Sequence, residues 1–169
     1  MTRFVALLRA VNVGGTGKLP MSELKAMCEA SGFTQVQTYI ASGNVVFSSS
    51  HAAAEVKSRL EARLQRYAGK PVRVVVRTAA QMAAVLASNP YSKAAPNRTL
   101  VIFLEQAPPE DALKHVTGQD AEQIALGEKE IYVHYGATMA QSKLKIPAAR
   151  DGTARNMNTV ARLVSLSAK

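Results

Sequence analysis

The sequence predicts an α+β fold made of two ferredoxin-like units (split-βαβ, or α/β plait), whose antiparallel sheets pack against helices. One observation is the order of strand and helix patterns in the first half, which reads β-α-β-β-α-β. The other is that a similar, less regular series of patterns follows in the second half and ends in a helix. We therefore expect a first domain at 1–78, a connecting helix and loop at 79–97, and a second domain at 98–169.

Each element of the first half is bounded by turn-forming residues. The apolar run at 3–11 predicts a strand, and the helix that follows it ends at Gly32. Alternation of apolar and polar residues on both sides of the turn at 42–44 predicts a β-hairpin. The next helix ends at Gly69, and alternating valines at 71–77 predict the last strand. The apolar stripe of this second helix consists of Val56, Leu60, Leu64 and Tyr67.

The second half repeats this order less clearly. A third helix at 78–88 leads into a proline-containing loop, and a strand at 99–104 follows. Two adjacent prolines predict the start of a helix at 108–116. Strands are expected around Ile124 and at 131–135, and the chain ends in a helix. No residue-level repeat relates the two halves, so the duplication rests on element order alone.

Composition is that of a globular protein and is compatible with a reducing compartment. The hydrophobic fraction of 47% is sufficient for a packed core. No apolar run approaches the ~20 residues of a membrane span, and the apolar N-terminus lacks the basic start and cleavage site of a secretory signal. Cys28 is the only cysteine, so the chain cannot form an internal disulfide. We expect a cytoplasmic protein with no membrane partner.

The net charge of +9 is distributed unevenly along the chain. Residues 1–85 contain 11 Lys or Arg and 4 Asp or Glu. Residues 99–135 reverse this balance, with 2 basic and 7 acidic side chains, and residues 136–169 are basic again. A polarised surface of this kind attracts anionic ligands and raises their association rates, but it does not select one ligand.

A glycine-rich segment at 12–18 has the character of a phosphate-binding loop. Its glycines would let backbone N–H groups approach an anion, and Lys18 would add a positive charge. The P-loop pattern fails at two positions, because Asn12 replaces the first glycine and Leu19 replaces the Mg²⁺-binding Ser or Thr. A nucleotide triphosphatase is therefore not expected. A tight strand-to-helix connection explains the glycines equally well.

The predicted topology brings this loop close to the turn at 42–44. A crossover helix makes the first two strands parallel, so both strands end at the same edge of the sheet. The helix that ends at Gly69 finishes at that edge too. Ser42 and Asn44 then add hydrogen-bonding groups to a charged rim, although a hairpin turn by itself favours the same residue types.

A second basic feature lies in the predicted C-terminal helix, which carries Arg155, Thr159 and Arg162 at helical spacing. With Asp151 or Thr153 as the N-cap, Arg155 and Asn156 would lie near the helix start. A cation at that position opposes the helix dipole. Either a nearby acid offsets the charge or an anion binds, and both interpretations remain open.

The remaining polar features are typical of structural roles. Arg59, Arg63 and Arg66 form a stripe on the second helix, which is more typical of a solvated face than of a nucleic-acid footprint. The three histidines lack metal-ligand spacing, no catalytic triad pattern is present, and no cofactor is indicated. Cys28 falls on the apolar stripe of the first helix and is expected to be buried.

Seven segments carry a family resemblance. They are Leu8–Gly15, Lys18–Met21, Tyr39–Phe47, Asn89–Tyr91, Ile131–His134, Ser142–Lys143 and Ala154–Thr159. Together they resemble the family of domain of unknown function 1697 (DUF1697), over essentially the whole chain. The resemblance implies a pair of ferredoxin-like α/β units with no established activity. One departure is Met157, which stands where the family's last block usually has Trp. The change removes a ring if the position stacks a ligand, whereas Met fills the same space if the position is packing.

These features favour binding of a small phosphate- or carboxylate-bearing ligand, in a cleft formed by the glycine-rich loop, the 42–44 turn and the C-terminal helix start. The candidate ligand-binding residues are Arg9, Asn12, Gly14, Gly15, Lys18, Ser42, Gly43, Asn44, Ser142, Lys143, Arg155, Asn156, Asn158 and Thr159. An RNA-binding module is the main alternative, although it lacks the exposed strand aromatics that RNA recognition needs. A non-enzymatic adaptor or an oligomeric protein is a further alternative. Catalytic residues, enzymatic activity and oligomeric state stay open.

Overall fold

The computed structural model describes residues 1–9 and 18–168 of the chain. The described residues fall into two compact units, one from Met1–Ala83 with Leu163–Lys169 and the other from Ala84–Arg162. Each unit contains one four-stranded antiparallel sheet. The predicted α+β fold with two ferredoxin-like units is therefore confirmed.

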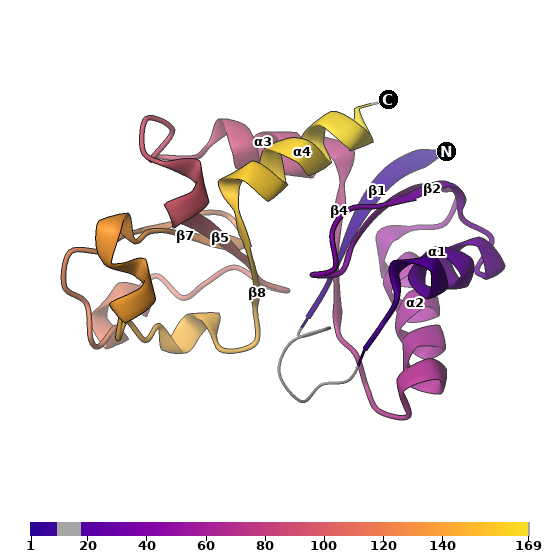
Figure 1. Cartoon of the computed structure of the whole chain (residues 1–169), viewed down its shortest axis with the longest axis horizontal. Coiled ribbons are helices and arrows are strands. Elements are labelled where there is room, and N and C mark those ends of the chain that lie inside the picture. Colours follow the sequence, from indigo (N-terminus) through magenta and orange to yellow (C-terminus); the bar gives the residue numbers. More distant parts are fainter. Residues whose placement is uncertain (10–17, 169) are drawn as a thin grey trace. The chain divides into compact units, whose positions relative to one another are not determined.

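The first unit has the split-βαβ arrangement. Its elements are β1 (Thr2–Leu8), α1 (Met21–Ala30), β2 (Thr34–Thr38), β3 (Asn44–Ser49), α2 (Ala53–Ala68) and β4 (Val74–Thr78). The strand order is β2-β3-β1-β4. Since β1 and β2 both pair antiparallel with β3, they run parallel to each other, as predicted. Helices α1 and α2 lie together on one face of this sheet (Figure 1).

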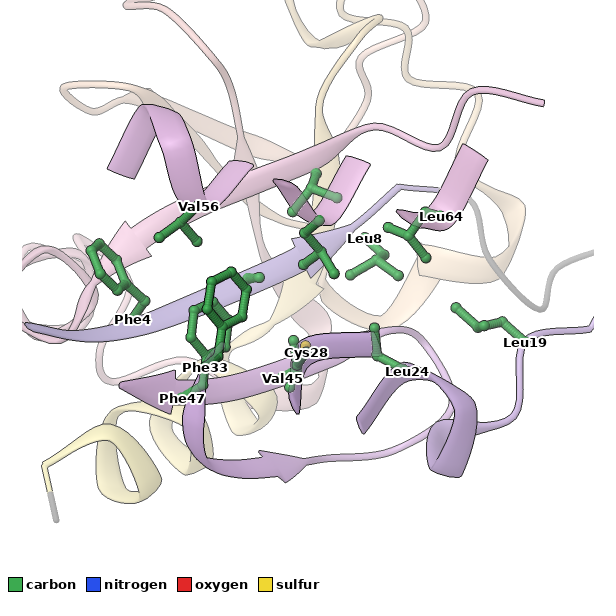
Figure 2. Close-up of a cluster of buried hydrophobic side chains, with 13 residues drawn as sticks. Phe4, Leu8, Leu19, Leu24, Cys28, Phe33, Val45, Phe47, Val56 and Leu64 are labelled. Atoms are coloured by element: carbon green, nitrogen blue, oxygen red, sulfur yellow. The ribbon is translucent and has the colours of Figure 1, made fainter. Parts of the chain in front are cut away.

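The core of the first unit lies between that sheet face and the two helices. Phe33 stacks on Phe47 with ring centroids 4.4 Å apart, and Leu8 and Leu64 lie at the other end of the cluster (Figure 2). Burying one such side chain stabilises the fold by about 1.5–3 kcal/mol. Cys28 is fully buried in this core, as predicted, and desolvation raises the pKa of its thiol to about 12.

The predicted end of α2 is confirmed, whereas its predicted buried stripe is wrong at one residue. Gly69 follows the helix with a left-handed φ of 72°, which confirms the predicted end of the helix. Tyr67 was predicted to continue the buried stripe, but it is 47% exposed. It lies in the last turn of α2, where an amphipathic ring keeps its hydroxyl group in water.

The second unit repeats the sheet of the first unit. Its strands are β5 (Thr99–Phe103), β6 (Gln123–Leu126), β7 (Glu130–His134) and β8 (Thr153–Asn156), in the order β6-β7-β5-β8. The register is also repeated, because Val5 lies opposite Arg77 in the first sheet and Val101 lies opposite Arg155 in the second. The duplication therefore extends beyond element order to strand order and residue register.

Within residues 84–162, all of which have described backbone, there is no long crossover helix like α1 or α2. The helix predicted at 108–116 is only the short 3-10 helix η2 (Ala112–His115), a form of helix that occurs mostly in short pieces. Further 3-10 helices are η1 (Pro96–Arg98), η3 (Gly136–Gln141) and η4 (Pro147–Ala149). One sheet face carries a core of Ile102, Leu104, Ile131 and Val133, against which Leu144 and Ile146 pack.

In each sheet, an α-helix begins directly after the last strand. Helix α3 (Ala79–Ala87) follows β4, and helix α4 (Met157–Ser167) follows β8. Thr78 caps α3 by accepting the backbone N–H of Gln81 at 3.1 Å, and Gln81 Oε1 accepts the N–H of Thr78 at 2.8 Å. This is a capping box. No helix within the described residues is long and apolar enough to cross a membrane.

Candidate functional site

The end of β1 lies beside two other segments of the first unit. Leu8 donates its backbone N–H to the carbonyl oxygen of Gly43 at 2.9 Å, and Arg9 donates its own to the carbonyl oxygen of Arg73 at 2.9 Å. Gly43 belongs to the turn before β3, and Arg73 directly precedes β4. These bonds confirm that the end of β1, the 42–44 turn and the segment after α2 meet at one end of the sheet.

Arg9 and Arg73 stand opposite each other across neighbouring chain segments. Leu8 pairs with Val74 in the β1–β4 register, so the next step along both segments places Arg9 opposite Arg73. Leu8 and Val74 point into the core, and alternation places the two arginines on the face away from α1 and α2. Opposed residues project from the same face, where like charges repel. The two arginine positions therefore share one end of one sheet face.

Two lysines add positive charge at this end of the sheet. Lys70 follows α2 and lies three residues before Arg73. Lys18 precedes Leu19, whose side chain packs at the Leu8 end of the core (Figure 2). Lys18, Lys70 and Arg73 are exposed, and none of the three forms an ion pair with a carboxylate of the described chain. We call the set Arg9, Lys18, Lys70 and Arg73 the basic rim.

Two members of the basic rim, Lys70 and Arg73, are not among the site residues that were predicted from the sequence. A signal for Arg73 was present in the predicted topology. In a split-βαβ unit the first and last strands are antiparallel neighbours. The residue before the last strand therefore lies beside the residue after the first strand, which is Arg9.

The Ser42-Gly43-Asn44 turn is shaped by its own hydrogen bonds. Asn44 is fully buried, and its amide donates to the carbonyl oxygen of Tyr39 at 2.9 Å and to Ser42 Oγ at 2.8 Å. Gly43 has a φ of 89°, a conformation that favours glycine. Asn44 and Gly43 therefore build the turn, and half-buried Ser42 is the member next to the rim.

The structure describes Arg9, which precedes the glycine-rich segment, and Lys18, which is its last residue. Asn12, Gly14 and Gly15 lie outside the described residues, so their role in a phosphate-binding loop stays a prediction. Arg9 and Lys18 both belong to the basic rim.

Arg155 lies on β8 and not in the first turn of the C-terminal helix, which corrects the prediction. Residues 153–156 pair with β5, and this tertiary pairing overrides their local helical spacing. The Arg155 side chain is 7% exposed. Its Nη1 donates to Thr153 Oγ1 at 2.6 Å and to the carbonyl oxygen of Ala154 at 2.9 Å. Burial lowers the pKa of Arg155 to about 10.

The start of the C-terminal helix is capped by Asn156 and not by Asp151 or Thr153. Asn156 Oδ1 accepts the backbone N–H of Thr159 at 2.9 Å, which assigns Asn156 a capping role. Thr159 is buried and Asn158 is exposed. Met157 is only 3% exposed, so this position packs against the protein and does not offer a surface for stacking.

Ser142 is engaged in a structural network of the second unit. Its hydroxyl donates to a carboxylate oxygen of Glu122, and its Oγ accepts the backbone N–H of Leu144 at 3.2 Å. The Ser142 bond, followed by the N–H of Asp120, lowers the pKa of Glu122. Lys143 is exposed, and its backbone carbonyl lies close against Gly118. The Ser142–Lys143 pair therefore holds two loops of the second unit together.

The described residues contain no group of three or more His, Cys, Asp or Glu side chains that could hold a metal ion. His51 lies 3.3 Å from Glu55, and His115 lies 3.3 Å from Asp111. On α2, Arg59 also pairs with Glu55 at 2.9 Å. This ion pair supports the interpretation of the arginine stripe as a solvated helix face.

A chain of known structure, described as that of conserved bacterial protein SP0830 from Streptococcus pneumoniae, has a similar fold. The two share 24% sequence identity with a TM-score of 0.81, and the likeness covers 98% of each chain. No curated protein matches the chain. Residues 1–132 match the model of the family described as "Protein of unknown function (DUF1697)". This match contains the first four of the seven segments that resembled the family, and the chain belongs to the DUF1697 family.

Proposed function

We propose that the protein binds a small ligand carrying a phosphate or carboxylate group at the basic rim. The observation that carries the proposal is the placement of Arg9 opposite Arg73 at the end of the sheet. Like charges at directly opposed positions destabilise a pair of strands. A bound anion would offset this repulsion, because each guanidinium can donate two parallel hydrogen bonds to a phosphate or carboxylate.

The residues around the two arginines would each contribute differently to binding. Lys18 and Lys70 would attract the ligand as exposed charges. Ser42 would add a hydroxyl group, and the buried Asn44 would hold the turn that positions Ser42. Asn12, Gly14 and Gly15 would contribute the backbone N–H groups of a phosphate-binding loop. The candidate residues of the second unit are not part of this proposed site.

A compact anion fits this charge pattern better than RNA does. The central strands β1 and β3 carry Phe4 and Phe47, and both rings are buried in the core. Base stacking needs an exposed ring, and these two rings cannot supply it. The exposed side chains of Lys18, Lys70 and Arg73 form no ion pair with a carboxylate of the described residues, and this local positive charge suits a ligand with one or two anionic groups.

Thermal unfolding in the presence of small anions tests the proposal. The panel contains inorganic phosphate, pyrophosphate and citrate, with chloride at matched ionic strength as the reference. We expect at least one of the three anions to raise the Tm of the wild type in a saturable way, since a ligand that binds only the folded state stabilises it. The Arg9→Gln and Arg73→Gln variants should lose most of this increase.

Arg59→Gln is the matched control, because it removes the same charge from the middle of α2, where Arg59 pairs with Glu55. This variant should keep the full anion-induced increase in Tm. If all three variants respond like the wild type, or if no anion raises the Tm beyond the chloride reference, the basic rim is not an anion site.

A further inference from the structure

A second polar arrangement lies in the second unit, within two of the segments that carry the family resemblance. His134 is the last residue of β7, and its Nδ1 lies 3.0 Å from the hydroxyl oxygen of Thr99 on the neighbouring strand β5. Thr99 is fully buried, and its hydroxyl also lies 3.1 Å from the carbonyl oxygen of Ala95. The three groups form a short chain that ends at the imidazole.

The arrangement that keeps both contacts of the Thr99 hydroxyl places a proton on Nδ1 of a neutral His134. A carbonyl oxygen only accepts hydrogen bonds, so the single hydroxyl proton of Thr99 is donated to Ala95. Thr99 Oγ1 can then only accept from His134, which requires a proton on Nδ1. In the opposite tautomer, Nδ1 and the carbonyl oxygen of Ala95 would both be acceptors. The single hydroxyl proton of Thr99 could then serve only one of them, and the other contact would be lost. His134 Nε2 is therefore left with a lone pair and acts as a hydrogen-bond acceptor.

Tyr91 lies next to this imidazole. The two ring centroids are 6.0 Å apart with an angle of 34° between the planes. Backbone bonds position the tyrosine, since its N–H donates to Asn89 Oδ1 at 2.9 Å and its carbonyl accepts from Ala94 at 2.9 Å. Desolvation raises the pKa of Tyr91, so its hydroxyl remains a neutral donor at physiological pH.

The polar ends of both rings are accessible to a ligand. Neither the Tyr91 hydroxyl nor His134 Nε2 has a hydrogen-bond partner among the residues that the structure describes, and both side chains are half-buried. Neither atom is among the buried polar atoms without a partner. Both groups therefore reach the solvent, while the rest of each ring is held by the second unit.

We propose that Tyr91 and His134 form a binding site for a neutral, polyhydroxylated ligand of the sugar or polyol class. A ligand hydroxyl would donate to Nε2 of His134, and a second ligand oxygen would accept from the hydroxyl of Tyr91. The two ring surfaces suit the C–H groups of such a ligand. The site is independent of the basic rim.

Nitrogen NMR of the histidine side chains, with D-ribose and myo-inositol as probes, tests both parts of this proposal. In the free wild-type protein at a pH where the imidazoles are neutral, His134 should carry its proton on Nδ1. Addition of at least one probe should shift Nε2 of His134 in a saturable way. His51 and His115 are internal controls, because each has a carboxylate partner, and their resonances should not move.

Three variants separate binding from folding. Tyr91→Phe keeps the ring but removes the hydroxyl, and it should weaken probe binding roughly fivefold or more. Thr99→Val should release the tautomer of His134, whereas Thr99→Ser should retain it. If Thr99→Val does not fold, the wild type and Thr99→Ser still carry the tautomer test. A proton on Nε2 in the wild type, or probe shifts that are absent or equal at all three histidines, would overturn the proposal.

Discussion

The backbone N–H of Arg9 donates to the carbonyl oxygen of Arg73 at 2.9 Å, which holds the two arginines opposite each other at one end of the first sheet. Two cations in this relation cost stability unless a negative charge lies between them. Binding and stability should therefore respond in opposite directions when one of the two charges is removed.

The first prediction follows from this opposition. Without ligand and at low ionic strength, Arg73→Gln should raise the free energy of unfolding by about 0.2–1 kcal/mol, because it removes the repulsion with Arg9. Added salt should reduce this gain, since exposed charges are screened. Urea unfolding at two salt concentrations measures both effects. Arg59→Gln is the control and should not stabilise the protein, because Arg59 pairs with Glu55. A loss of stability in Arg73→Gln would contradict the account.

The buried amide of Asn44 carries the second prediction. Asn44→Ala removes the hydrogen bonds to Tyr39 and Ser42 inside a fully buried turn. We expect a decrease of about 1–3 kcal/mol in the free energy of unfolding, measured by urea denaturation. Ser42→Ala removes only one of these partners from a half-buried position, and it should cost less. Equal effects of the two substitutions would show that the amide does not hold the turn.

The third prediction compares two glycines with the same backbone conformation. Gly118 and Gly136 have φ angles of 69° and 68°, but a Cβ on Gly118 would lie 2.0 Å from the carbonyl oxygen of Lys143, whereas nothing lies within 4 Å of one on Gly136. Gly136→Ala should cost about 1 kcal/mol from the backbone alone. Gly118→Ala should cost at least ~2 kcal/mol more, because the loop must move away from Lys143. Chemical denaturation of both variants measures the difference, which should vanish if the two loops do not touch.

Tyr132 carries a prediction about alkaline pH. Its hydroxyl donates to the carbonyl oxygen of Val85 at 2.8 Å, and burial, with a smaller effect of Glu130, raises its pKa from 10.0 to about 12. The folded state favours the neutral phenol, so the contribution to stability is complete below pH 10 and is lost as the pH rises towards 12. The loss amounts to roughly 2 kcal/mol.

The matched variants for this prediction are Tyr132→Phe and Tyr67→Phe, since Tyr67 is 47% exposed. Tyr132→Phe should be less stable than the wild type near neutral pH, because Val85 loses its donor, but its stability should fall less steeply between pH 10 and pH 12. Tyr67→Phe should follow the wild-type curve. Parallel alkaline curves for the wild type and Tyr132→Phe would contradict the assigned shift.

The first unit could be predicted from its sequence because its signals are local. Gly69 marks the end of α2, and alternating residues around the 42–44 turn mark the hairpin. Strand β8 could not be predicted in this way, because its four residues become a strand only through pairing with β5. The same pairing moved Arg155 from an expected helix start into a buried position.

In the candidate site, too, some features follow from the sequence and others depend on tertiary contacts. The meeting of the β1 end with the 42–44 turn follows from topology, and the sequence indicated it. Which side chains stand opposite each other depends on the register, and this is why Arg73 was omitted beside Arg9. The structural roles of Asn44 and Ser142 depend on hydrogen bonds to Tyr39 and Glu122, which no sequence spacing reveals.

The most direct test of the central claim is a titration of the ¹⁵N-labelled protein with pyrophosphate, followed by the backbone amide resonances at constant ionic strength. We expect saturable shifts that are strongly reduced in Arg73→Gln and that are largest at Arg9, Ser42, Gly43, Lys70 and Arg73. Absence of saturable shifts at these amides, or shifts concentrated on the α2 face of Arg59 and Arg63, would contradict binding of an anion at the basic rim.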